Sequence, residues 1–108
     1  MNKILSMIGM AMKAGKIVSG EFMTEKAVKT GMAFLVIVSA EASENTKKMF
    51  RNMCIFYNVP MYCYGTKDEL GHCIGKEFRA SMAVTEEGFA KSIMKKLNEA
   101  EIIAEVAE

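Results

Sequence analysis

Disulfide frameworks, histidine-based metal centres and membrane spans all lack their usual signals in this chain. The three cysteines, Cys54, Cys63 and Cys73, are odd in number and have neither disulfide nor metal-ligand spacing, which indicates a reduced, cytoplasmic setting. The single histidine, His72, excludes a metal site built on several histidines. No apolar run reaches the roughly 20 residues that span a bilayer. We therefore expect a cytoplasmic protein with no metal and no cofactor.

Signals for catalysis and for a generally basic surface are missing as well. The chain has no P-loop, and no glycine-rich dinucleotide pattern follows a predicted strand. The cysteines have no evident activating partner, and we expect them to pack inertly. The formal net charge is +1, so the chain lacks the strong positive charge of many nucleic-acid binders. We predict a non-enzymatic protein in which any nucleic-acid contact depends on local arrangement.

What is present is the composition of one globular domain, residues 1–108. The chain is 51% hydrophobic and 25% charged, enough for one core. Residues 1–14 have the periodicity of an amphipathic helix and are interrupted by Lys3 and Lys13, unlike the apolar centre of a signal peptide. The most informative stretch is 33–57. Its unbroken apolar run 34–38 predicts a strand covered on both faces, and Ser43 is expected to cap the helix that follows, 44–57.

The remaining elements alternate in the same way. Helices are expected over 1–14, 21–30, 44–57, from Thr66 to Gly75, and from Thr85 onward; strands are expected over 16–19, 34–38, 61–64 and 80–84. The last ten residues are expected to extend the final helix or to fray. This alternation predicts an α/β fold, a three-layer α-β-α sandwich with a mixed, largely parallel four-stranded sheet.

Three predicted strand-to-helix turns are lined with small residues, at 19–21, 40–43 and 85–88. If their strands run parallel, the three helix N-termini gather on one edge of the sheet. Their unpaired amides and positive dipole ends would then favour phosphates or carbonyl oxygens. Such turns also occur in α/β domains without this role, so the alternative is a purely structural edge.

The charges near these turns are mixed. The carboxylates expected near this edge are those of Glu21, Glu41, Glu44, Glu86 and Glu87, and the amines expected there are those of Lys13, Lys16, Lys26 and Lys47. A phosphate clamp would not need so many acids, whereas a site that reads bases can use carboxylates as acceptors. The alternative is that these acids only offset helix dipoles.

Several segments together resemble one family along nearly the whole chain. They are GKIVSG at 15–20, GEFMTEKAVKTGMAFLVIVSAEASENTKK at 20–48, YNVP at 57–60, GTKDELGHCIGK at 65–76 and VTEEGFAK at 84–91. The combination resembles the kink-turn-binding ribosomal protein family of the archaeal large-subunit L7Ae type, and within it the small bacterial YlxQ-like branch. The resemblance implies an α-β-α sandwich that binds RNA through the turn edge.

The resemblance also assigns residues, and one departure stands out. In well-known members, the second helix opens with a glycine, then asparagine and glutamate, then a lysine. Gly20 and Lys26 match the ends of that pattern, whereas Phe22 and Met23 stand where the polar pair that bonds sheared guanine–adenine pairs would be. Glu41 matches the acidic turn after the central strand, and residues 84–86 match the start of the final RNA-contacting loop.

From this resemblance and the turns we expect RNA recognition where the RNA helix is distorted. Lys26 is expected to reach a guanine edge or a phosphate, and Phe22, if exposed, to stack on an unpaired base. The alternatives are core or hinge packing for Phe22 and a solvated helix position for Lys26. The predicted RNA-binding residues are Ser19, Gly20, Glu21, Phe22, Lys26, Glu41, Ala42, Ser43, Val84, Thr85 and Glu86.

The predicted function is therefore a non-enzymatic, ribosomal-protein-like protein that binds a structured, kinked RNA, associates with the ribosome and acts as a monomer. The first alternative is a protein-interaction module on the same fold without kink-turn binding. The second is a small-molecule site or enzyme at the strand ends, which lacks a nucleophile–base pair.

Overall fold

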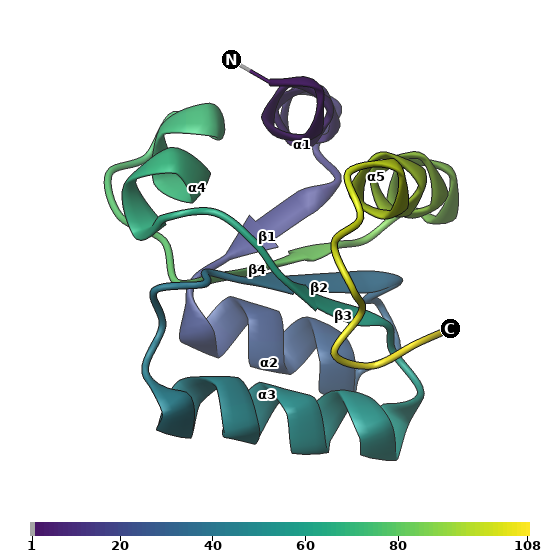
Figure 1. Ribbon diagram of the computed structural model, residues 1–108. Coiled ribbons are helices and arrows are strands. Elements are labelled where there is room, and N and C mark those ends of the chain that lie inside the picture. Colours follow the sequence, from purple (N-terminus) through teal and green to yellow (C-terminus); the bar gives the residue numbers. More distant parts are fainter. Residues whose placement is uncertain (1) are drawn as a thin grey trace.

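A four-stranded sheet lies between two layers of helices in the computed structural model, which describes residues 2–108 (Figure 1). The strands are β1 (Ile17–Ser19), β2 (Leu35–Val38), β3 (Met61–Cys63) and β4 (Ser81–Val84). The helices α2 (Glu21–Lys29) and α3 (Glu44–Tyr57) cover one face; α1 (Lys3–Lys13), α4 (Lys67–Cys73) and α5 (Glu87–Glu99) cover the other. The predicted three-layer sandwich is confirmed. The predicted start of the first helix at Met1 lies outside the described residues.

The central strand β2 explains why both faces need helices. All four of its residues are buried, and their side chains alternate between the two faces. Leu35 and Ile37 pack into the cluster beneath α1, α4 and α5, whereas Val36 and Val38 pack into the cluster over α2 and α3. None of the helices in residues 2–108 is long and apolar enough to cross a membrane.

The sheet is mixed, as predicted, but the expectation that it is largely parallel is wrong. The strand order is β1-β4-β2-β3, and β4 pairs antiparallel with both β1 and β2. Only the β2–β3 pair is parallel. Strands β1, β2 and β3 therefore point in one direction, and β4 returns between them in the opposite direction.

The ends of α2 and α3 follow the signals in the sequence with one change. Gly31 (φ 75°) follows the C-cap of α2, and Asn58 adopts the left-handed conformation (φ 57°) at the end of α3. The inward stripe of α2 begins at Thr24, which is fully buried, rather than at Met23, whose side chain is exposed. Met23 is therefore available at the surface.

The start of the final helix and the path of the C-terminal tail both differ from the predictions. Glu86, not Thr85, caps α5, because its carboxylate accepts hydrogen bonds from the amides of Gly88 and Phe89. The last residues neither extend α5 nor fray: Glu101 (φ 62°) turns the chain back, and Val106 pairs antiparallel with Met61 at the edge of β3. An ion pair of 2.7 Å between Arg51 and Glu105 fastens this tail to α3.

Candidate nucleic-acid interface

The ends of β1 and β2 and the start of β4 meet at one edge of the sheet, which we call the carboxyl edge. It consists of residues 19–22, 39–43 and 77–81, and we include the adjoining exposed side chain of Lys26 on the same helix as Phe22. The amide of Gly20 donates to the carbonyl of Ser81 (2.9 Å), and the amide of Ser39 donates to the carbonyl of Ala80 (2.8 Å). These bonds hold two of the predicted turns beside each other. They also hold the turns beside the segment 77–81, which the sequence did not predict as part of the site.

The third predicted turn lies at the other edge. The amide of Thr85 donates to the carbonyl of Lys16, which precedes β1, and Val84 pairs with Ile17 at the start of that strand. Because β4 runs antiparallel, Val84, Thr85 and Glu86 are carried away from Ser19 and Gly20. The expectation that all three helix N-termini gather on one edge is therefore wrong for the turn 85–88. The Glu86 carboxylate also caps α5, and its hydrogen bonds to the amides of Phe89 and Gly88 lower its pKa.

The N-terminus of α2 is open at the carboxyl edge. Its N-cap is Gly20, whose φ of 90° favours glycine and which has no side chain to bond the amides of the first turn. Asn2, Ser43, Thr66 and Glu86 each cap their own helix through a side-chain oxygen. Among the helices of residues 2–108, only α2 therefore presents first-turn amides without a capping side chain.

Two predicted contact residues have their side chains engaged in shaping the edge. Ser43 accepts a hydrogen bond from the amide of Thr46 as the cap of α3. Glu41 accepts one from the amide of Lys67 (2.9 Å) and so links the turn after β2 to the start of α4. One oxygen of Glu41 is thus used inside the protein, and its main role is to hold this turn in place.

The backbone amides at this edge are less available than expected. The amide of Gly20 is bonded to Ser81, and the amide of Ala42 is bonded to the carbonyl of Ser39 (3.0 Å). Ala42 is also buried. The amides of Gly20 and Ala42, two of the predicted RNA contacts, are therefore not free for a ligand, because the turns use them in hydrogen bonds within the protein. The open amides belong to the first turn of α2, from Glu21 onward.

Arg79 is the residue at this edge that the sequence reasoning missed. Its Nε donates to the hydroxyl of Ser19 (3.0 Å) and its Nη1 to the carbonyl of Phe78 (2.7 Å). It forms no ion pair within residues 2–108. A guanidinium fixed beside the open end of α2 is suited to phosphate or a guanine edge. Arg79 lies in the irregular segment before β4, which has no helical or strand periodicity from which its position could be predicted.

Phe22 and Lys26 lie outside the core on α2. The side chain of Phe22 is 74% exposed, which excludes the core or hinge alternative. Lys26 is exposed and forms no ion pair in the described part of the chain. It lines two shallow depressions, of about 350 Å³ on the side of Phe22 and about 210 Å³ on the side of Met23.

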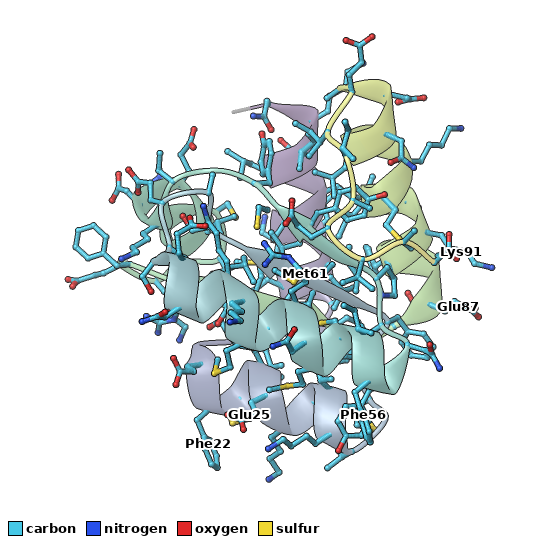
Figure 2. All side chains as sticks on the ribbon, turned by 60° about the horizontal axis from the view of Figure 1, so that its bottom comes forward. Phe22, Glu25, Phe56, Met61, Glu87 and Lys91 are labelled. Carbon is cyan, nitrogen blue, oxygen red and sulfur yellow. The ribbon has the colours of Figure 1, made fainter. Side chains whose placement is uncertain are left out.

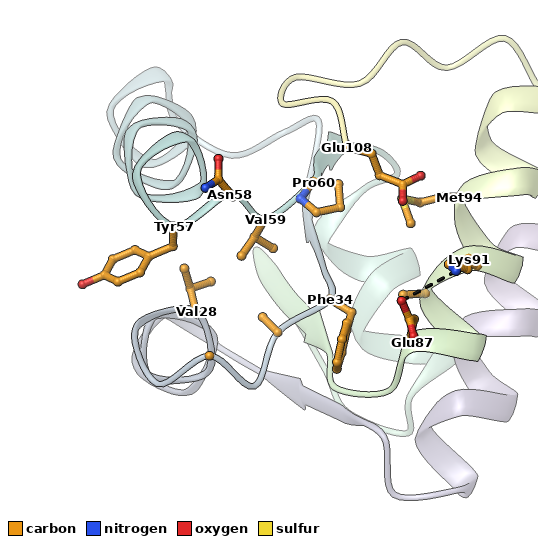
Figure 3. A pocket seen from close by; sticks show the side chains of 13 residues that line it. Val28, Phe34, Tyr57, Asn58, Val59, Pro60, Glu87, Lys91, Met94 and Glu108 are labelled. Atoms are coloured by element: carbon orange, nitrogen blue, oxygen red, sulfur yellow. Dashed lines mark ion pairs between the residues drawn. The ribbon is translucent and has the colours of Figure 1, made fainter.

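The opposite edge holds a different cavity, a cleft of about 400 Å³ between α5 and the start of β2 and β3 (Figure 3). Phe34, Val59, Pro60 and Met94 give it an apolar lining, and the one ion pair at its mouth joins Lys91 to Glu87 (3.6 Å). This edge therefore offers apolar surface with a paired lysine and a second carboxylate, Glu108. At the carboxyl edge, Arg79 and Lys26 form no ion pair within residues 2–108, and neither do the carboxylates of Glu21 and Glu77.

The cysteines do not provide a nucleophile. Burial raises the pKa of the Cys54 thiol to about 12 and that of the Cys73 thiol to about 11. Burial also raises the pKa of Cys63. All three thiols stay protonated at neutral pH, and only the thiolate form is strongly nucleophilic.

Comparison with known proteins assigns the chain to a family. Over 92 residues it is 38% identical to the RNA-binding protein YlxQ of Bacillus subtilis, covering 85% of this chain and 92% of the relative. It is 33% identical over 82 residues to the large ribosomal subunit protein eL30 of Sulfolobus acidocaldarius, covering 74% and 79% of the two chains. A solved structure of a Bacillus halodurans protein of unknown function matches with a TM-score of 0.86 at 34% identity, over 89% of this chain and 97% of that one.

The two named relatives are an RNA-binding protein and a ribosomal protein, which are non-enzymatic. A model of the ribosomal protein L7Ae/L30e/S12e/Gadd45 family matches residues 2–94. The chain belongs to the L7Ae/L30e/S12e/Gadd45 family of ribosomal proteins.

Proposed function

We propose that the protein binds a structured RNA at the carboxyl edge and has no catalytic activity. The observation that carries the proposal is the open N-terminus of α2, with Arg79 beside it and Lys26 further along the same helix, in a member of this family. Neither cation forms an ion pair within residues 2–108. Unpaired amides and the positive end of a helix attract phosphate oxygens, and the two side chains add formal positive charge to this attraction.

Within this site the residues have different roles. Lys26 and Arg79 contact phosphates or a guanine edge, and the amides of Glu21 and Phe22 meet backbone oxygens. Ser19, Glu41 and Ser43 hold the two turns in position through the hydrogen bonds that they form inside the protein. Ala42 keeps its turn compact by being buried. Thr85 lines the depression on the Met23 side of Lys26 and so borders the site, whereas Val84 is buried in β4 and Glu86 caps α5.

The RNA is one whose helix is distorted. An undistorted A-form helix hides its base edges in a deep, narrow major groove, so the edge of this small domain meets bases only where the helix is kinked, bulged or open. A kink-turn in ribosomal RNA has such a distortion. We propose that the protein acts on it as a monomer in the cytoplasm, in association with the ribosome, and that residues 1–108 work as one unit.

Equilibrium binding to a folded kink-turn RNA and to fragments of bacterial ribosomal RNA tests the proposal. Each RNA is titrated with the protein in the presence of excess unstructured competitor RNA. Binding to either RNA that resists the competitor is the expected result. If neither RNA binds under these conditions, RNA is not the ligand of the carboxyl edge.

A further inference from the structure

We propose that Phe22 stacks on a base that has left the RNA helix while Lys26 binds an adjacent phosphate, so that the protein selects RNA with an unpaired base. This inference rests on the proposed RNA-binding function and deepens it. It names the feature of the RNA that the surface of α2 recognises.

The first observation is the position of the ring. Phe22 is the second residue of α2, next to the open turn at Gly20, and its side chain projects away from the body of the protein (Figure 2). At 74% exposure, both faces of the ring are largely accessible to solvent. An exposed ring at a surface that already carries cations is suited to stacking, because every base has a π face.

The second observation is the arrangement of charge beside the ring. Lys26 follows Phe22 by four residues, so the two side chains are neighbours on one face of the helix. With Glu25, Lys29 and Thr30 they line the depression of about 350 Å³. The Glu25 carboxylate is balanced by Lys29 at 2.7 Å. Lys26 is thus the cation beside the ring that remains without an ion pair in residues 2–108.

The chemistry of phenylalanine restricts what this surface can recognise. The side chain has no donor or acceptor, so it cannot read the edge of a base pair. It can only offer its face, and a base within a continuous helix has both of its own faces covered by neighbours. The ring therefore favours a base from a bulge, a loop or an end, and a nearby ammonium suits the phosphate of the same strand.

A second exposed ring on the same helical layer provides a matched comparison. Phe56 on α3 is 77% exposed and lies at the other end of this layer (Figure 2). Pro60 stands four positions after it and Asn52 four positions before it, so it has no cation at the spacing that joins Phe22 to Lys26. Its ring also packs edge-to-face against Tyr57, with the ring centroids 4.9 Å apart. Phe56 therefore tests whether an exposed aromatic ring without a neighbouring cation is sufficient for the preference for an unpaired base.

The experiment uses two RNA hairpins of the same length. One carries a single bulged 2-aminopurine, and in the other that nucleotide is paired with uracil. Affinity and 2-aminopurine fluorescence are measured for the intact protein, for Phe22→Leu, for Phe22→Tyr and for Phe56→Leu. A folded kink-turn RNA is titrated in parallel to report RNA binding itself.

The expected result is tighter binding to the bulged hairpin by roughly 5- to 150-fold, the range of one stacked base, with quenched fluorescence. Phe22→Leu should remove the preference, whereas Phe22→Tyr and Phe56→Leu should keep it. If the protein binds both hairpins equally, or if Phe22→Leu binds like the intact protein, the inference is overturned while RNA binding stands. If neither hairpin nor the kink-turn RNA binds, the proposed function is overturned as well.

Discussion

The two edges of the sheet expose apolar side chains in different settings. At the carboxyl edge, the exposed ring of Phe22 stands beside an uncapped helix and two cations without ion pairs, Lys26 and Arg79. At the opposite edge, Phe34 and Pro60 line a cleft whose lysine, Lys91, is paired with Glu87. There the Glu86 carboxylate also caps α5 by accepting hydrogen bonds from two amides of its first turn.

This difference shows why exposed apolar surface alone does not identify a nucleic-acid site. Each edge has aromatic residues and a helix start. What separates them is whether amides and cations are already used within the protein. The antiparallel insertion of β4 creates this contrast, because it sends the start of α5 to one edge and Arg79 to the other.

The largest effect is expected from Gly71→Ala in α4. A Cβ at this position would lie 1.6 Å from the carbonyl oxygen of Glu77, a backbone atom that has to move. We expect a loss of about 1–3 kcal/mol in the free energy of unfolding, or more. Because the segment 77–81 carries Arg79, RNA affinity should fall as well. Urea unfolding and RNA titration measure the two effects.

Gly88→Ala is the matched control at the opposite edge. A Cβ there would meet the flexible carboxylate of Glu86 at 3.1 Å, and alanine favours the helical conformation by up to about 1 kcal/mol. We expect nearly unchanged stability and unchanged RNA affinity. Equal losses in the two variants would contradict the contrast between the edges.

Arg79→Ala should weaken RNA binding by roughly 10- to 100-fold, the effect of losing hydrogen bonds to a charged partner. It also removes the bond that holds Ser19 beside the segment before β4. Arg79→Lys should recover only part of the affinity, because lysine lacks the planar fork of donors. Full recovery by lysine would show that charge alone matters at this position. RNA titration at one salt concentration gives the comparison.

Lys26→Ala should weaken binding by roughly three- to tenfold and reduce the log–log salt slope by about one unit, as expected for one phosphate contact. Lys91→Ala removes the same charge at the opposite edge, where the amine is paired with Glu87. It should leave the slope nearly unchanged. Equal changes in slope for the two variants would show that only the net charge of the protein matters.

The smallest effect concerns Glu86. Its pKa is lowered because its carboxylate accepts bonds from the amides of Phe89 and Gly88. The stability that it adds is present above the unfolded pKa of about 4.3 and is lost as pH falls through the lower, folded pKa. Glu86→Gln should reduce the loss of folding stability that occurs as the pH falls. It should leave RNA affinity unchanged at neutral pH. Thermal unfolding as a function of pH tests the first statement, and an RNA titration at neutral pH tests the second.

Local patterns were sufficient to predict the elements and the layers. The caps at Ser43 and Thr66 and the strand within the run 34–38 depend on neighbouring residues, and each is found in the structure. Only Phe34 departs from the run, because it precedes the strand and is exposed. The direction of β4 is different, because Ser81–Val84 has the same alternation in either direction. Only its pairing with β1 and β2 fixes its direction, and the spacing of residues within the segment does not predict that pairing.

The candidate site divides in the same way. Phe22 and Lys26 belong to a regular helix, so their common face follows from spacing alone. Arg79 lies in an irregular segment and becomes part of the edge only through the sheet, which places it against Ser19. The sequence predicts that the final helix starts at Thr85, whereas in the structure the longer carboxylate side chain of Glu86 bonds two amides of the first turn.

The most direct test is an NMR titration of the isotope-labelled protein with a folded kink-turn RNA or a bulged hairpin. We expect the amide signals of Phe22, Lys26 and Arg79 at the carboxyl edge to shift or broaden first, while those of Phe34, Asn58 and Glu87 at the opposite edge stay in place. Shifts confined to Phe34, Asn58 and Glu87 would contradict the placement of RNA at the carboxyl edge.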